Sequence, residues 1–196
     1  MTDIRIVRDY PYPPELVWRA VTDPALIPRW TATGRGGRPA GFSATVGTRF
    51  RFVGRSLPGW DGVVYCEVVA ARAPELLRYT WAESESGAPT YVTYRLEATA
   101  DGTRFSYDHT GFTGLGGLLL ARLVLGPVRR KMLDVGLPPV LASLSVLAGE
   151  SAADGRGVDE QGDGDGGGEQ DGGAPDHGHG EAVHGAGRDA RGGVGG

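Results

Sequence analysis

Four consecutive strand-like segments, the first rich in valine and the other three alternating in polarity, constrain the fold of this chain more than any other feature. They are Asp61–Ala71, Leu76–Glu83, Thr90–Ala100 and Thr103–Thr110. Successive side chains of a β-strand point to opposite faces, so this alternation predicts strands with one apolar and one polar face. The Asp101-Gly102 pair between the last two is typical of a tight hairpin turn. The sequence therefore predicts an antiparallel meander with one face in water.

The apolar faces of these strands carry aromatic rings that end in polar atoms. A buried hydroxyl or imidazole needs a hydrogen-bonding partner, so a purely structural core more often uses Val, Ile and Leu. Wide rings with polar ends suit the wall of a cavity. The residues predicted to face inward from the last three strands are Leu77, Tyr79, Trp81, Val92, Tyr94, Leu96, Ala98, Phe105, Tyr107 and His109.

The segments before this meander predict a strand, two helices and another strand. Ile4–Tyr10 alternates, and the prolines after it favour a helix that starts near Pro14 and carries its apolar stripe to Val21. Pro24–Trp30 predicts a second, short helix. Thr31–Val46 has little periodicity and is interpreted as a loop, whereas Gly47–Val53 alternates as a strand.

The segment Leu115–Leu147 predicts a long C-terminal helix. Its first part, Leu115–Leu125, is apolar nearly all round but too short to span a bilayer, so we interpret it as a helix buried under the sheet. Pro138-Pro139 should break or bend the helix near Gly136. The residues expected to continue the buried stripe are Val128, Met132, Val135, Val140, Leu141, Leu144 and Leu147.

Residues 149–196 differ in composition from everything before them. They contain eleven of the 24 acidic residues, three of the 20 basic ones and no aromatic residue. Such a segment cannot bury enough apolar surface to offset the ordering of its backbone. We therefore predict one folded domain, residues 1–148, and a disordered acidic Gly/Asp-rich tail, residues 149–196. The histidines of the tail lack the fixed ligand set of a metal site, so no metal or cofactor is expected.

Charge, cysteine content and the N-terminus favour a cytoplasmic protein. The folded part is only mildly basic, which does not predict a nucleic-acid partner. Cys66 is the only cysteine, so no intrachain disulfide can form. The N-terminus lacks the pattern of a signal peptide, and no membrane span is predicted. Nineteen arginines against one lysine suggest a bacterial coding bias.

In order, these elements predict an α+β domain in which a curved antiparallel sheet of about six strands wraps around the long C-terminal helix. Such a wedge between sheet and helix is a default ligand site. Several motifs in this order resemble the START-like SRPBCC superfamily, in the branch homologous to the C-terminal domain of the ATPase activator of the 90-kDa heat-shock chaperone. They are PPELVWRAVTDPALIPRW, Trp60-Asp61-Gly62, Ala73-Pro74-Glu75-Leu76-Leu77 before Tyr79-Thr80-Trp81, and Asp101-Gly102-Thr103-Arg104.

The resemblance covers about residues 3–148 and implies a helix-grip fold with a deep hydrophobic cavity. Members of the superfamily bind lipids, hormones or polyketides, and some cyclise or dehydrate polyketides. Many in this branch have no assigned reaction, and the superfamily has no invariant catalytic set that could be transferred to this chain. The resemblance therefore leaves open whether this protein is an enzyme.

Two polar residues of the predicted cavity could do chemistry. His109 is the only histidine of the folded part and could act as a general acid or base, although a hydrogen-bonded core histidine is the more common case. Glu67 would line the cavity only if its face of the Asp61–Ala71 strand points inward, because both faces of that strand are apolar. Otherwise it is a solvated glutamate.

We therefore expect the protein to bind a small hydrophobic molecule, aromatic, acyl or polyketide-like, without confident catalytic activity. One alternative is a polyketide cyclase- or dehydratase-like enzyme with His109 as acid and base. Another is a protein-interaction or co-chaperone-like module, and the protein could also form a homodimer. The expected ligand-binding residues are Trp18, Trp30, Phe50, Phe52, Glu67, Tyr79, Trp81, Val92, Tyr94, Phe105, Tyr107, His109 and Met132.

Overall fold

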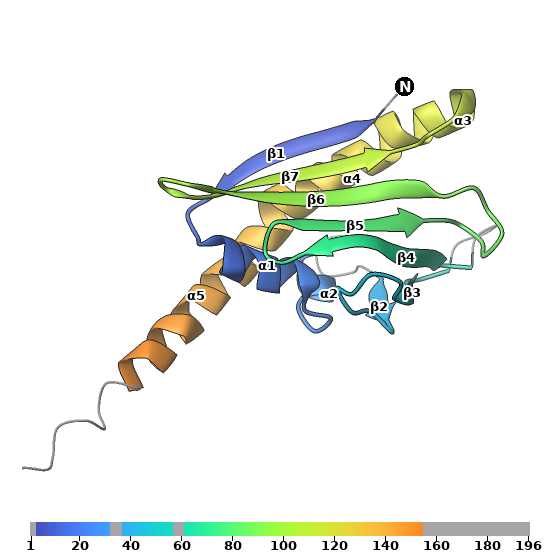
Figure 1. The fold of residues 1–196 in the computed structure, drawn as a ribbon. Helices are drawn as coiled ribbons and strands as arrows, with labels where there is room; N and C mark the ends of the chain where they lie inside the picture. Colours follow the sequence, from blue (N-terminus) through green and yellow to red (C-terminus); the bar gives the residue numbers. More distant parts are fainter. Residues whose placement is uncertain (1–2, 32–36, 57–60, 155–196) are drawn as a thin grey trace, which may run out of the picture. The chain divides into compact units, whose positions relative to one another are not determined.

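The computed structural model describes residues 3–31, 37–56 and 61–154, and it contains one seven-stranded antiparallel sheet (Figure 1). The first strand of the chain pairs with the last one and forms an edge of the sheet, so the spatial order is β1-β7-β6-β5-β4-β3-β2. Ile4 pairs with His109 and Tyr10 with Thr103. The strands are β1 (Ile4–Tyr10), β2 (Arg38–Ala40), β3 (Arg49–Val53), β4 (Val63–Arg72), β5 (Leu76–Trp81), β6 (Thr90–Thr99) and β7 (Gly102–Thr110).

The alternation read from the sequence matches the burial of the strands. Leu77, Tyr79, Tyr94, Phe105 and Tyr107 are all buried on the face that meets the helices. Charged residues of the opposite face form cross-strand ion pairs. The alternation is not strict, because Thr93 and Ser106 on that face are also buried and Ala98, predicted to face inward, is exposed. The inner face of the meander is therefore confirmed as the main wall of the core.

Two short helices, α1 (Pro14–Thr22) and α2 (Ile27–Trp30), follow β1 as predicted. A proline starts α1, where its missing N–H is harmless, and Glu15 lies in the first turn. The buried face of α1 contains Val17 and contacts the C-terminal helix. Trp30 is fully buried and donates a hydrogen bond from Nε1 to the carbonyl of Ala20 at 3.0 Å, which joins the two helices.

The C-terminal helical run crosses the inner face of the sheet and alternates between α- and π-helical segments (Figure 1). Each π segment is followed directly by an α segment whose second residue is proline. Pro138-Pro139 therefore does not end the helix. The segments are α3 (Gly114–Leu119), η2 (Leu120–Leu125), α4 (Gly126–Lys131), η3 (Met132–Gly136) and α5 (Leu137–Asp154).

The π segments correct the predicted orientation of this helix. Val128, Val135 and Leu147 are exposed, not buried, and the inner face instead repeats every four residues. In a pure α-helix with 3.6 residues per turn, a four-residue repeat drifts by about 40° per step. A π turn holds one more residue and cancels that drift. The repeat is Gly117, Ala121, Leu125, Arg129, Leu133, Leu137 and Leu141.

Three further differences separate the structure from the sequence predictions. The segment interpreted as a loop contains β2, a three-residue edge strand, which raises the strand number from about six to seven. The segment Leu115–Leu125 is largely exposed and not buried under the sheet. Ala121, a small residue, faces inward, whereas the side chain of Leu123 is 68% exposed. Helix α5 continues to Asp154, beyond the predicted start of the tail at residue 149. The rest of the tail lies outside the described residues.

By length and composition alone, the helical run Gly114–Gly149 could cross a membrane. The core helix of a soluble protein passes the same test, and here Met132, Leu133, Leu137 and Leu141 are buried in the core. A single helix of this kind is weak evidence for a membrane protein.

Candidate functional site

A small cavity of about 100 Å³ lies in the wedge between the sheet and the C-terminal helix. Four aromatic residues of β3, β5 and β6 form one wall, and Arg129 and Met132 of the helical run form the opposite wall. Residues without large side chains form much of the remainder. The lining residues are Thr31, Gly37, Phe52, Gly54, Gly62, Val64, Tyr79, Trp81, Tyr94, Arg129 and Met132.

The cavity is much smaller than the deep hollow implied by the family resemblance, because the aromatic rings pack against one another. The ring centroids of Phe52 and Trp81 are 5.6 Å apart, and those of Tyr79 and Tyr94 are 5.8 Å apart. Tyr107 continues the cluster at 5.7 Å from Tyr94. Pockets for drug-sized ligands usually measure roughly 300–1,000 Å³. This cavity therefore has room for the compact end of a ligand and not for a large polycyclic molecule.

Three tyrosine hydroxyls supply polarity within the cluster. The hydroxyls of Tyr79 and Tyr94 are hydrogen-bonded at 2.9 Å. The hydroxyl of Tyr107 is buried and interacts with the guanidinium of Arg129. Burial raises the pKa of all three tyrosines, so they are neutral phenols at neutral pH. Neutral phenols can donate hydrogen bonds to a ligand oxygen.

His109 is fully buried at the end of β7 and has a defined tautomer. The Thr90 hydroxyl donates to the carbonyl of Trp81 at 3.0 Å, so it accepts from Nε2–H of His109 at 2.8 Å. Nδ1 then carries a lone pair that finds no partner in the described part of the chain. Burial, and secondarily the charge of Arg129, lower the pKa of His109 to about 3. A neutral imidazole that resists protonation is poorly suited to acid–base catalysis near neutral pH.

Arg129 is the functional residue that sequence reasoning missed. The residue keeps some exposure, but its Nε atom is enclosed and makes no hydrogen bond to any described residue. Its guanidinium carbon lies 4.8 Å from the centre of the Trp81 ring, and Nη1 is 3.3 Å from the Met132 sulfur. Extending the spacing of Leu141, Leu137 and Leu133 back by four residues would have placed Arg129 inside.

The predicted ligand-binding residues fall into three groups. Phe52, Tyr79, Trp81, Tyr94 and Met132 line the cavity. The second group, Phe50, Phe105, Tyr107 and His109, is buried in ring contact with lining residues. The third group, Trp18, Trp30, Val92 and Glu67, does not line the cavity.

Glu67 lies on the outer face of the sheet, so the prediction that it could line the cavity is wrong. Cys66 and Val68 beside it are buried, and alternation places Glu67 on the other side. Its carboxylate pairs with Arg49 at 3.1 Å, and the Glu67 side chain is 41% exposed. It is therefore the solvated glutamate of the alternative interpretation.

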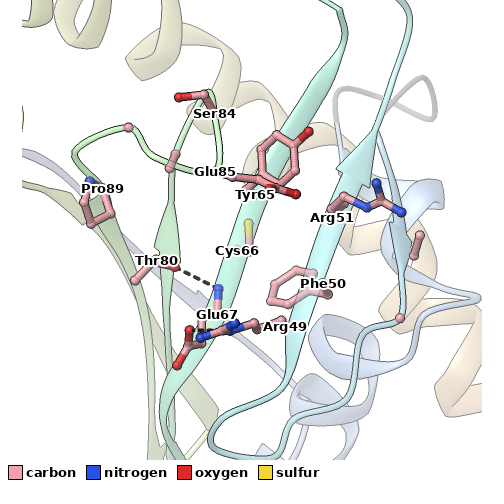
Figure 2. A pocket seen from close by; sticks show the side chains of 14 residues that line it. Arg49, Phe50, Arg51, Tyr65, Cys66, Glu67, Thr80, Ser84, Glu85 and Pro89 are labelled. Atoms are coloured by element: carbon pink, nitrogen blue, oxygen red, sulfur yellow. Dashed lines mark hydrogen bonds and ion pairs between the residues drawn. The ribbon is translucent and has the colours of Figure 1, made fainter.

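A larger, open hollow lies on this outer face, beside β3, β4 and the β5–β6 connection (Figure 2). Arg49, Arg51, Tyr65 and Glu67 project into it, and Glu85 approaches from the connection. Arg49 and Glu67 pair across two of these strands, and both side chains keep contact with water. It resembles a shallow polar groove and lacks the enclosed aromatic walls of a small-molecule site.

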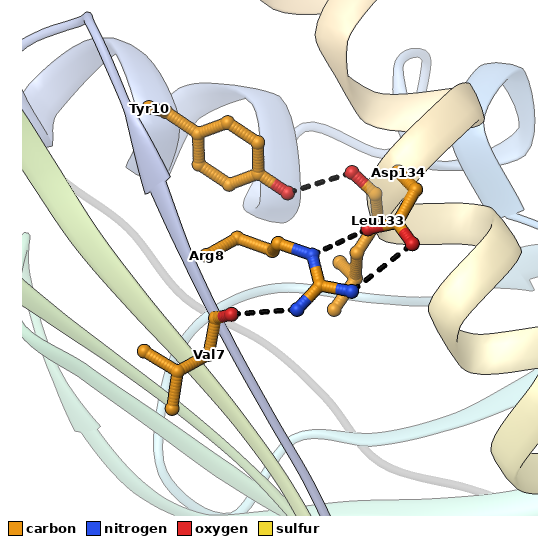
Figure 3. Close-up of polar contacts among 5 residues, drawn as sticks. All are labelled: Val7, Arg8, Tyr10, Leu133 and Asp134. Atoms are coloured by element: carbon orange, nitrogen blue, oxygen red, sulfur yellow. Dashed lines mark hydrogen bonds and ion pairs between the residues drawn. The ribbon is translucent and has the colours of Figure 1, made fainter.

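Contacts between β1 and the segment η3 fix the helix beside the cavity (Figure 3). The guanidinium of Arg8 pairs with both carboxylate oxygens of Asp134, and Nη2 is 3.0 Å from Oδ2. The hydroxyl of Tyr10 donates to the carbonyl of Leu133 at 2.8 Å. These contacts anchor the π segment to the sheet and set which helix residues face the cavity.

A curved antiparallel sheet that grips a long C-terminal helix, with an aromatic cavity between them, defines a helix-grip domain. The family model described as "Activator of Hsp90 ATPase homolog 1-like protein" matches residues 11–118, which is more than half of the chain. The chain belongs to this family, within the SRPBCC-type superfamily. The comparison with curated proteins gives no match.

Solved structures of bacterial proteins share this fold. Protein MLL2253 from Mesorhizobium loti is 27% identical, with a TM-score of 0.60 over 72% of this chain and 98% of that protein. CalU16 from Micromonospora echinospora is 25% identical, with a TM-score of 0.51 over 78% of this chain and 86% of that one. DynU16, described as a putative protein in the dynemicin biosynthetic locus, is 25% identical, with a TM-score of 0.52 over 69% of this chain and 48% of its own.

Proposed function

We propose that this protein binds a small hydrophobic molecule, aromatic or acyl, whose compact end enters the cavity between the sheet and the C-terminal helix. One observation carries the proposal. The cavity is walled by aromatic rings, yet the guanidinium at its edge has an enclosed Nε–H that no described residue accepts. Buried polar atoms are rarely left without a partner, so a ligand that supplies one would complete this site.

Two further observations support binding over catalysis. The neutral state of His109 and its hydrogen bond to Thr90 suit a structural or ligand-contacting histidine. The relative DynU16 is described as belonging to a biosynthetic locus, which is consistent with a small-molecule ligand. A cytoplasmic location and a homodimer stay predictions from the sequence.

Native mass spectrometry of freshly purified protein tests the proposal. We expect a species heavier than the bare chain by the mass of a small molecule, which is released on denaturation. Val64→Phe would fill the cavity from β4, so this variant should lose the extra mass. Val69→Phe on the same strand points outward and should retain it. Equal loading of the two variants, with both folded by circular dichroism, would contradict binding in this cavity.

A further inference from the structure

Arg129 differs in its surroundings from the arginines that form ion pairs in the structure. Six arginines pair with carboxylates, and in each of these pairs both partners keep some contact with solvent. Arg129 has an enclosed Nε and no carboxylate partner within the described ranges. The paired arginines are Arg5, Arg8, Arg49, Arg72, Arg95 and Arg104.

The neighbours of Arg129 are polarisable but carry no negative charge. Its guanidinium lies over the face of Trp81 and 5.9 Å from the ring centre of Tyr107, and it touches the Met132 sulfur. Cation–π contacts lower the cost of burial but do not neutralise the charge. An arginine side chain stays protonated in proteins, so it cannot relieve the cost by losing its proton. Counting the described residues, the site therefore has one positive charge in excess.

We propose that the cavity binds the carboxylate of an apolar acid, with Arg129 as its counter-ion. This inference rests on the proposed function and assigns the chemical class of the ligand. The planar guanidinium matches a carboxylate, and its unused Nε–H offers a charge-assisted hydrogen bond. The hydroxyl of Tyr107, buried in the same aromatic cluster beside the guanidinium, stays protonated and could turn toward the acid as a second donor.

The dimensions and lining of the cavity fit this class of ligand. A volume of about 100 Å³ holds a carboxylate and the first carbons of its chain. Phe52 and Trp81 supply apolar contact for those carbons. Gly37, Gly54 and Gly62 also line the cavity and contribute no side chains that would fill it. A cationic ligand would meet only like charge.

Calorimetric titration with 3-phenylpropionate and with 3-phenylpropionamide tests the proposal, because the two compounds share shape and differ in charge. We expect the wild type to bind the acid about tenfold or more tightly than the amide. Arg129→Met should abolish this preference and leave weak, equal binding of both compounds. The matched control Arg130→Met changes the adjacent, exposed arginine and should keep the preference.

The melting temperature of the ligand-free protein provides a second readout. Replacing an arginine with a purely structural role would lower this temperature, whereas replacing Arg129 should not. Removing an unneutralised charge should raise it in Arg129→Met by about 2 °C or more. Equal binding of acid and amide by the wild type would overturn the carboxylate assignment and leave the proposed function intact. A preference that survives in Arg129→Met, or no binding of either compound, would overturn it as well. Equal loading of Val64→Phe and Val69→Phe in native mass spectrometry is what would remove the proposed function.

Discussion

Two arginines near the π segment η3 have opposite surroundings. Arg8 reaches the helix from β1, pairs with both oxygens of Asp134 and remains partly in water. Arg129 reaches the cavity from α4. There aromatic rings and a sulfur atom surround its guanidinium, and no described carboxylate forms an ion pair with it. An exposed pair contributes little stability but specifies position, whereas an enclosed lone charge costs stability. The comparison indicates that Arg8 fixes the position of the helix, whereas Arg129 is available to bind a ligand.

Packing should hold the helix far more strongly than the Arg8 pair does. Leu133, directly before Asp134, is almost fully buried, so Leu133→Ala should lower the free energy of unfolding by roughly 2–5 kcal/mol in urea titrations. Val135 on the same segment is 57% exposed, and Val135→Ala should stay within about 0.5 kcal/mol of the wild type. Similar losses in the two variants would show that η3 is not oriented as described.

The buried histidine should make the protein acid-sensitive. In the folded state the pKa of His109 is lowered to about 3, whereas an ordinary histidine titrates near 6.5. Between these values the unfolded chain binds a proton that the folded chain does not, so stability falls as the pH drops from about 6.5 toward 3. The slope should approach about 1.4 kcal/mol per pH unit from this residue.

Urea unfolding of the wild type and of His109→Gln between pH 7 and 4 measures this contribution. The variant removes the titrating ring and keeps a polar group for Thr90, so its stability should depend less on pH. Parallel pH profiles for the two proteins would mean that His109 takes up its proton in the folded state near its ordinary pKa of about 6.5. That result would also revive the acid–base role of this residue.

The two arginines should respond in opposite directions to the same substitution. Arg129→Met should raise the free energy of unfolding of the ligand-free protein by about 1 kcal/mol or more, because an unpaired buried charge is replaced by an apolar chain of similar length. Arg8→Met should lower it by up to about 1 kcal/mol. Chemical denaturation at matched pH measures both. A loss of stability in both variants would show that Arg129 is structurally paired.

The smallest expected effect is the coupling between Arg8 and Asp134. A double-mutant cycle with Arg8→Met and Asp134→Asn should give about 0.2–1 kcal/mol, and added salt should reduce it. The hydrogen bonds from Arg8 hold the pKa of Asp134 below its ordinary value, so this contribution is present at neutral pH and is lost as the pH falls through that lowered pKa. A coupling that survives high salt would indicate a more buried pair than the structure shows.

The sheet could be predicted because the sequence pattern that indicates it, alternating polarity, can be recognised within each strand separately. Period-two alternation states directly that Tyr79, Tyr94 and Tyr107 share a face, and the structure confirms this. Strand β2 was missed because three residues show no period, and only backbone pairing with β3 defines it. Glu67 stayed ambiguous because both faces of its strand are apolar, and only the pairing of neighbouring strands decides which face is inside.

The helix wall of the cavity was harder to predict, because its periodicity changes along the chain. A constant helical period places Val128 and Val135 inside, whereas the π segments preserve a four-residue repeat that brings Arg129 inward. Charged residues are also usually expected to face water, and this expectation was a second reason why Arg129 was not predicted to face the cavity. Sequence reasoning thus predicted most of the aromatic wall and missed the charge opposite it.

The nuclear magnetic resonance signal of the Arg129 Nε–H tests the central claim most directly. The signal can be assigned by its disappearance in Arg129→Met, and 3-phenylpropionate can then be titrated into the wild-type protein. The account predicts that this signal moves downfield and that its exchange with water slows, as expected when a carboxylate accepts the proton. A signal that stays unchanged at saturating acid would contradict the account.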